Sequence, residues 1–180
     1  MGPGTVGIAR SAFVTPPEFR GLEATGDPAA RVGGARIELV PVGNSTGMGT
    51  LYQQIPVRVL PPFEFDREPA SLLYLITLTT GLMDGDAHLF DIVARSGTRT
   101  VITGQSASRL HPAVKSFASQ HWNATVEDDA VLVVLPGPAI PYRDCRFFQR
   151  GRIALAPTAR MIWGDIWLAG RYDRGALSER

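Results

Sequence analysis

The sequence predicts a mainly β protein made of stacked β-hairpins, in the manner of a β-helix, with few short helices. Extended apolar runs recur along the chain, and three later segments share one pattern of strand, turn and strand. A single hairpin cannot bury its apolar face alone, so repeated hairpins are expected to stack around a shared core.

The three similar segments begin at Ile92, Ala124 and Ile153, so 32 and 29 residues separate their starts. Each consists of an extended run, a short turn and a second extended run. This spacing indicates stacked β units, although short hairpins also resemble one another by chance. The best helix candidate lies around residues 106–117, and Pro112 limits its length.

Folding is expected to begin at the alternating strand of residues 35–40. Residues 1–34 are rich in Gly, Pro and Ala and show neither helical nor strand periodicity. This composition predicts a poorly ordered N-terminal extension. Residues 35–180 are expected to form a single β-rich domain, because 180 residues is the length of one domain with a sizeable core.

Composition excludes several classes of function. The hydrophobic content of 44% fits a folded protein, and a net charge of +1 gives no general attraction to nucleic acid or to an anionic membrane. Cys145 is the only cysteine, which excludes an intrachain disulfide and a cysteine-rich metal site. The sequence shows no signal-peptide pattern and no apolar run of membrane-spanning length, which predicts a cytoplasmic protein.

The turn at residues 80–86 joins two extended apolar runs and carries two glycines and two carboxylates. Gly81 and Gly85 permit a tight reversal, and Asp84 and Asp86 suit turns because aspartate bonds its own backbone. The carboxylates are therefore either turn formers alone or polar functional groups presented by a loop that buried neighbours hold in place.

Ordered blocks of the chain resemble the UreD/UreH family of urease accessory proteins. The similar blocks are an early strand, a glycine-rich turn, a strand with a polar turn, a proline-containing segment and a closing Gly-Arg segment. They lie at residues 52–59, 81–86, 97–109, 135–149 and 163–171. The motif residues are Gly81, Gly85, Gly97, Gly170 and Arg171. Family members usually continue with more β structure, so the chain is expected to be a short or C-terminally truncated member.

The resemblance implies a non-enzymatic scaffold for urease maturation. Such a protein binds the urease apoprotein and joins it, through the partner UreF, to the GTPase UreG, and the whole complex can form a homodimer. The resemblance further implies no tightly bound cofactor, with nickel in transit through an internal tunnel.

A path that nickel must leave again should avoid dense His and Cys clusters, because these ligands hold the ion tightly. Scattered carboxylates and hydroxyls meet that requirement, and the candidates are Asp84, Asp86, His88 and Ser108. Asp86 matches the family's Gly-Asp position. His88 follows two residues later on the same face of an extended strand, and it is either a transient ligand or an ordinary half-exposed histidine.

Two other functions remain open at this point. Ser106, His111 and Asp86 supply the nucleophile, base and orienting acid of a small hydrolase, but the sequence lacks the Gly-x-Ser-x-Gly motif. A generic β-rich interaction module would need no reactive residues.

Overall fold

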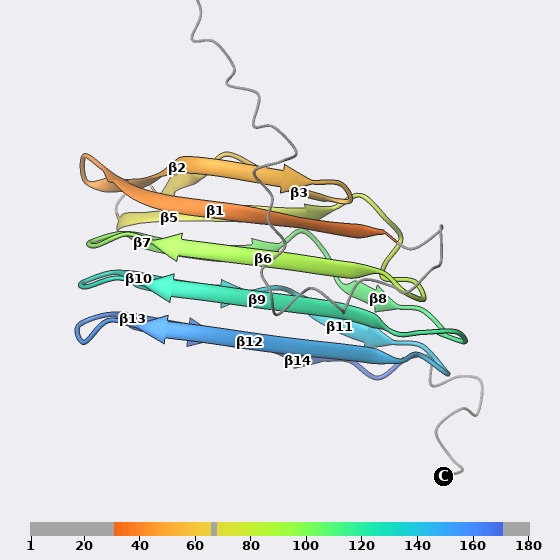
Figure 1. Cartoon of the computed structure of the whole chain (residues 1–180). Helices are drawn as coiled ribbons and strands as arrows, with labels where there is room; N and C mark the ends of the chain where they lie inside the picture. The colour runs from red at the N-terminus through yellow and green to blue at the C-terminus, as the bar shows by residue number, and fades with distance from the viewer. Residues whose placement is uncertain (1–30, 66–67, 171–180) are drawn as a thin grey trace, which may run out of the picture.

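The computed structural model describes residues 31–65 and 68–170, and their strands stack as a solenoid of three sheets (Figure 1). This part of the chain contains strands but no helix, and hence no helix long and apolar enough to cross a membrane. The mainly β, β-helix-like fold is confirmed. The helix expected at residues 106–117 is wrong, because backbone N–H groups in this stretch donate to the side chain of Asp84.

The first sheet has five strands in the order β12-β9-β6-β1-β2. They are β1 (Val32–Val42), β2 (Ser45–Gln54), β6 (Ala87–Ala94), β9 (Ala118–Val126) and β12 (Phe147–Leu155). Four of them run parallel, whereas β2 runs antiparallel to β1. The first strand starts at Val32, earlier than the predicted residue 35. Residues 1–30 of the expected extension lie outside the described residues.

The second sheet has the order β13-β10-β7-β5-β3, with β4 also paired to β5. Its strands are β3 (Val57–Val59), β4 (Phe63–Phe65), β5 (Glu68–Thr77), β7 (Arg99–Gly104), β10 (Val131–Leu135) and β13 (Arg160–Trp163). A smaller third sheet has the order β14-β11-β8. It contains β8 (Ser108–Leu110), β11 (Pro138–Pro141) and β14 (Ile166–Trp167).

Three successive coils each contribute one strand to every sheet: β6-β7-β8, then β9-β10-β11, then β12-β13-β14. The predicted repeat follows this stacking, since Ile92 is in register with Ala124, and Ala124 with Ile153. The repeating unit is not a hairpin, however. The two strands of each unit lie in different sheets and pair with the equivalent strands of neighbouring coils. Short turns built from residues such as Gly97, Asp128 and Pro157 suit either arrangement, so the turn residues could not distinguish them.

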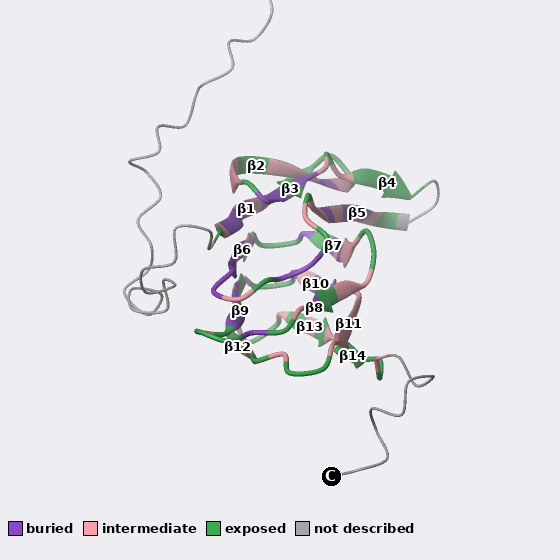
Figure 2. Cartoon of the chain, turned by 90° about the vertical axis from the view of Figure 1, so that its right-hand side faces the viewer, coloured by how far each residue is buried: buried purple, intermediate pink, exposed green. Residues whose placement is uncertain are grey.

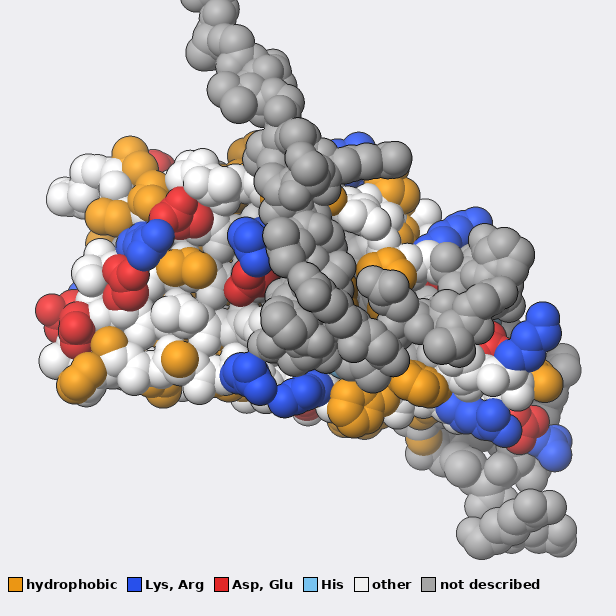
Figure 3. All heavy atoms as spheres, in the orientation of Figure 1, with side chains coloured by type: hydrophobic (Ala, Val, Ile, Leu, Met, Phe, Trp, Pro, Cys, Tyr) orange, Lys and Arg blue, Asp and Glu red, His pale blue; other side chains and the backbone are white. Residues whose placement is uncertain are grey.

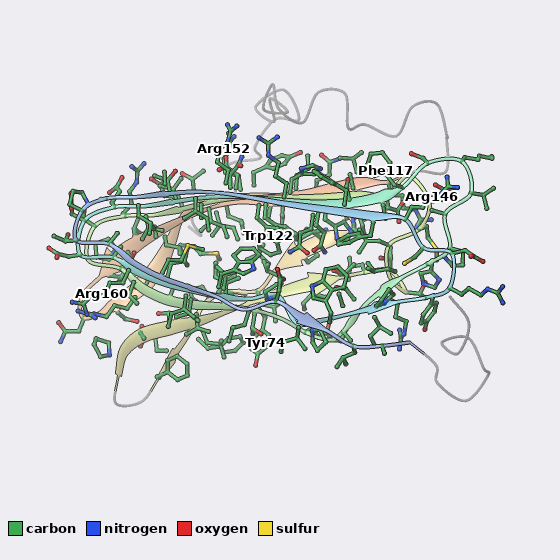
Figure 4. The ribbon with its side chains drawn as sticks, turned by 90° about the horizontal axis from the view of Figure 1, so that it is seen from below. Tyr74, Phe117, Trp122, Arg146, Arg152 and Arg160 are labelled. Atoms are coloured by element: carbon green, nitrogen blue, oxygen red, sulfur yellow. The ribbon has the colours of Figure 1, made fainter. Side chains whose placement is uncertain are left out.

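The main core lies between the first two sheets, where alternate side chains of each strand point inward (Figure 4) and Figure 2 shows buried residues on these strands. Phe90 of β6 stacks on Trp122 of β9, with ring centroids 3.9 Å apart. A smaller apolar cluster contains Leu82, Leu110 and Ala118 and lies toward the third sheet. The two clusters leave a junction between them at one end of the coils.

Gly81→Ala is expected to destabilise the fold more than Gly97→Ala. Both glycines have positive φ, 147° and 77°, which costs about 1–2 kcal/mol for a residue with a side chain. A Cβ at Gly81 would lie 2.2 Å from the carbonyl oxygen of Arg109, whereas nothing lies within 4 Å of a Cβ at Gly97. In urea unfolding, Gly97→Ala should lower the free energy of unfolding by about 1–2 kcal/mol and Gly81→Ala by more than about 3 kcal/mol. Equal losses would contradict this difference.

Candidate functional site

The carboxylate-bearing turn lies against the third sheet. Leu82 forms a parallel bridge with Leu110, in which the Leu82 N–H donates to the Arg109 carbonyl at 2.8 Å and the His111 N–H to the Leu82 carbonyl at 2.9 Å. The turn therefore occupies the place that a strand of the third sheet takes in later coils. This position sets the orientation of both aspartates.

Asp86 is 2% exposed, and both of its carboxylate oxygens accept backbone hydrogen bonds. One accepts from the N–H of Arg31 and the other from the N–H of Met83, both at 2.9 Å. The first bond holds the start of β1 against the turn, and the second closes the turn itself. The geometry thus gives Asp86 a structural role, as the turn-former interpretation of the sequence allowed.

Asp84 is half-buried and fastens the loop that follows β8. Its carboxylate accepts the backbone N–H groups of Lys115 at 2.7 Å and of Val114 and Ser116 at 2.8 Å. These bonds, that from Lys115 foremost, lower the pKa of Asp84. The ionised carboxylate therefore ties two loops together across the end of the coils.

His88 points inward from β6 beside Phe90, with the two rings edge-to-face at 6.3 Å. Its side chain is 1% exposed, and neither ring nitrogen finds a hydrogen-bond partner among residues 31–65 and 68–170. Burial lowers the pKa of His88 to about 4, although the nearby Asp86 charge opposes this shift. The ring is therefore neutral at physiological pH, and it is fully buried rather than half-exposed.

A cavity of about 50 Å³ lies at the junction of the two apolar clusters. Phe90 and Trp122 line it from the main core, and Leu82 from the smaller cluster. The rest of the wall is largely polar, and its hydroxyl and amide side chains are those of Thr77, Thr79, Thr80, Gln105, Ser106, Ser108 and Gln120. The volume accommodates a few water molecules or a small ion with part of its hydration shell.

A second, open groove has a volume of about 700 Å³, and Thr79 and Thr80 line both this groove and the cavity. Both carboxylates of the turn line the groove, together with Met83 and the cationic Arg31. A groove with carboxylate oxygens and a cavity with hydroxyl and amide groups therefore adjoin at these two threonines.

The structure does not bring all the predicted site residues together. Asp84 and Asp86 line the groove, Ser108 lines the cavity, and His88 lines neither. Among the described residues, no group of three or more His, Cys, Asp or Glu side chains is arranged to hold a metal ion. Arg171 of the closing motif lies outside the described residues.

Sequence reasoning missed several residues of the cavity wall. Gln120 carried a detectable signal, because it occupies an inward position of β9, alternating with Ala118 and Trp122. A polar residue in that periodic position indicates a break in the apolar core. Thr79 and Thr80 carried no comparable signal, since threonines are common in turns.

The three hydrolase candidates are separate. His111 contacts the Thr80 carbonyl through Nε2 at 3.4 Å and packs edge-on against Tyr142. Asp86 is bonded to backbone N–H groups, and Ser106 lines the cavity. No hydrogen bond joins any two of Ser106, His111 and Asp86, all of which the structure describes, so a nucleophile, base and acid are not linked.

Comparison with known proteins identifies the family. The family model described as "UreD urease accessory protein" matches residues 31–180. The chain belongs to the UreD family. It is similar to urease accessory protein UreD 2 of Streptomyces griseus, with 29% identity over 84% of this chain and 52% of the relative. It is also similar to UreD 3 of Methylorubrum populi, with 34% identity over 67% of this chain and 40% of the relative.

UreD of Sporosarcina pasteurii is 29% identical over 76% of this chain and 54% of that protein. The chain thus spans about half the length of the curated UreD relatives that it matches.

Acidification is expected to destabilise the fold through His88. The folded protein keeps this imidazole neutral down to about pH 4, whereas its ordinary pKa is 6.5. Below pH 6.5 the unfolded chain therefore binds a proton that the folded protein does not, so stability falls as the pH falls. The loss between pH 6.5 and about 4 should approach about 3 kcal/mol, measured by urea unfolding. His88→Phe should remove this part of the pH dependence, whereas the control His111→Gln should retain it. If the free energy of unfolding of His88→Phe falls with pH as steeply as that of the wild type, His88 is not the cause of the destabilisation.

Asp84→Ala is expected to release the loop after β8. The backbone N–H groups of Val114, Lys115 and Ser116 would lose their shared acceptor, so their amide hydrogens should exchange faster with solvent. Hydrogen exchange followed by NMR measures this directly. Asp91→Ala is the matched control, because Asp91 pairs with Arg36 on the first sheet. Equal exchange rates in the wild type and Asp84→Ala would show that the carboxylate does not hold the loop.

Proposed function

We propose that this chain acts in urease maturation as a non-enzymatic accessory scaffold. In this role it binds the urease apoprotein and, with UreF and the GTPase UreG, assists nickel insertion in the cytoplasm. The observation that carries the proposal is the family match over residues 31–180. The unlinked arrangement of Ser106, His111 and Asp86 favours this role over hydrolysis.

We further propose that nickel passes through the polar junction at the end of the coils. The groove offers carboxylate oxygens at its wall, and the adjoining cavity offers hydroxyl and amide groups. Oxygen ligands bind nickel more weakly than imidazole or thiolate clusters do, so an ion can enter and leave again. In this scheme the segment of Thr79 and Thr80 is the barrier between the two spaces, and its movement would open the path.

The two aspartates are less suited to hold the ion than their charges suggest. Asp86 uses both oxygens to hold the turn and β1, and Asp84 uses both to hold the loop after β8. Their charges attract a cation in the groove without direct coordination, although the charge of Arg31, which also lines the groove, opposes this attraction. The direct contacts are assigned to Ser108 and the neighbouring cavity groups.

Filling the cavity should separate scaffolding from nickel delivery. Ser108→Phe places a large ring at the cavity wall, whereas Ser96→Phe places the same ring on an exposed turn. When each variant is co-expressed with the urease subunits, UreF and UreG, both should co-purify with the complex. Only Ser108→Phe should lower the nickel content of urease, by severalfold, as measured by atomic emission.

Two results would count against these proposals. Full nickel loading with a folded Ser108→Phe variant would exclude passage through this cavity. Failure of the wild-type chain to co-purify with any urease component would exclude the scaffold role and leave a generic β-rich interaction module.

A further inference from the structure

The two large sheets turn different kinds of side chain outward. Figure 4 shows Arg152 of β12 and Tyr74 of β5 pointing away from the core on opposite sides of the molecule. Charges of both signs lie on the outer face of the first sheet (Figure 3), where Arg36 of β1 pairs with Asp91 of β6 at 2.7 Å. The outward side chains of the second sheet are largely apolar, so the two outer faces suit different contacts.

A row of apolar side chains crosses the outer face of the second sheet. One residue from each of β4, β5, β7, β10 and β13 contributes to this row, in register from strand to strand: Phe63, Leu72, Val101, Val133 and Ile162. Residues an even number of positions away in the same strand share this side, and they add Tyr74, Ile76, Val131 and Leu135. We call all these residues the apolar band. Each is half-buried or exposed, and a patch of this extent marks an interaction site more often than ordinary surface does.

Arginines border the apolar band at both ends of its strands. Arg99 of β7 and Arg160 of β13 are both in register with Val131 at one end. Arg58 of β3 is in register with Ile76 at the other end. All three arginines are exposed, and in the described part of the chain none has an ion pair or a side-chain hydrogen bond. Their guanidinium groups are therefore available to a partner.

Two carboxylates lie in the turn before β10, at the same end as Arg99 and Arg160. Asp128 accepts a hydrogen bond from the Thr158 hydroxyl at 3.0 Å, and the backbone N–H of Asp129 donates to that hydroxyl at 2.8 Å. Neither carboxylate forms an ion pair with either arginine, all four residues being described. The two aspartates lower the net charge at this end without occupying the donors of the arginines.

The arginines disfavour a second copy of this chain as the occupant of the band. If two copies stacked these faces, either relative direction of their strands would bring arginines of one copy close to arginines of the other. Like charges that meet at an interface oppose binding. Carboxylates at both ends of an apolar partner surface would instead form charge-assisted hydrogen bonds with the guanidinium groups.

The backbone of the occupant indicates its shape. The N–H and C=O groups of a sheet point toward neighbouring strands, so a segment that lies on the face of the sheet must pair its own backbone groups. An α-helix does this internally. Ser71 is in register with Thr100, so Arg99 is level with Ala70, six positions before Ile76. Six positions of a strand span about 20 Å, which is the length of a helix of about 13 residues.

We propose that the apolar band is the docking surface for an amphipathic helix of an acidic partner protein. The apolar side of the helix would cover Val101, Val133 and the residues around them. Carboxylates near its two ends would bind Arg58 at one end and Arg99 and Arg160 at the other. No residue of the band lines the cavity or the groove, so the proposal is independent of the nickel path and of the role in urease maturation.

The test uses two synthetic helical peptides with the whole chain. Each has about 14 residues, leucine at every third or fourth position and a lactam bridge on its polar side. One carries glutamate at both ends, and the other carries lysine at the same positions. Fluorescence anisotropy should show that the glutamate peptide binds more than about tenfold more tightly. In two-dimensional NMR spectra, the residues whose signals shift on binding should lie on the second sheet.

A pair of valine substitutions separates the two outer faces. Val133→Glu places a carboxylate at the centre of the band and should weaken binding of the glutamate peptide by more than about tenfold. Val93→Glu is the matched control, because Val93 is also half-buried but lies on the outward side of β6, in register with Glu38 and Thr125 of the first sheet. It should leave binding unchanged.

Charge reversal tests the role of the arginines separately. Combined replacement by Arg58→Glu, Arg99→Glu and Arg160→Glu should reverse the preference, so that the lysine peptide binds more tightly than the glutamate peptide. All three positions are exposed, so the variant is expected to fold, and circular dichroism checks this.

Several outcomes would overturn the proposal. The first is that the wild-type chain binds neither peptide, or binds both equally. The second is equal weakening by Val133→Glu and Val93→Glu. The third is sedimentation of the chain with phosphatidylserine vesicles that Val133→Glu abolishes, because a lipid surface would then be the ligand. The fourth is a two-copy complex of the wild-type chain that Val133→Glu splits, because a second copy would then occupy the band.

Discussion

In-register stacking of inward-facing apolar side chains holds this solenoid together. Parallel strands of one coil bond only to the coils beside them, so each coil depends on its neighbours to bury its inner side. The contact of Phe90 with Trp122 and the alignment of Ile92 with Ala124 show this dependence. Polar Gln120 at an inward position interrupts the stack, and the cavity lies at that interruption.

In the turn at residues 80–86, both carboxylates serve as acceptors for backbone N–H groups and are therefore fixed in position. Asp84 and Asp86 both accept hydrogen bonds from backbone N–H groups at the end of the coils. In the proposed nickel path, the carboxylates would attract the ion from the groove, and the hydroxyl and amide groups of the cavity would make the direct contacts.

The repeat, the β class and the stacking were predictable, because an apolar period and a spacing near 30 residues survive in the sequence of Ile92, Ala124 and Ile153. Which strands pair with each other was not predictable, because a strand-turn-strand pattern fits both a hairpin and the corner of a solenoid. The loop after β8 was mistaken for a helix because its hydrogen bonds go to a side chain 30 residues away. Of the predicted site residues, the two carboxylates line the groove, Ser108 lines the cavity, and His88 is a buried core residue.

The three bonds from the loop to Asp84 have a consequence for how this region tolerates change. They are made by main-chain N–H groups, so they do not specify the side chains of Val114, Lys115 and Ser116, and that of Val114 is 81% exposed. The loop can therefore keep one shape while its outward chemistry varies. Different side chains at Val114 would therefore display different surfaces on an unchanged frame.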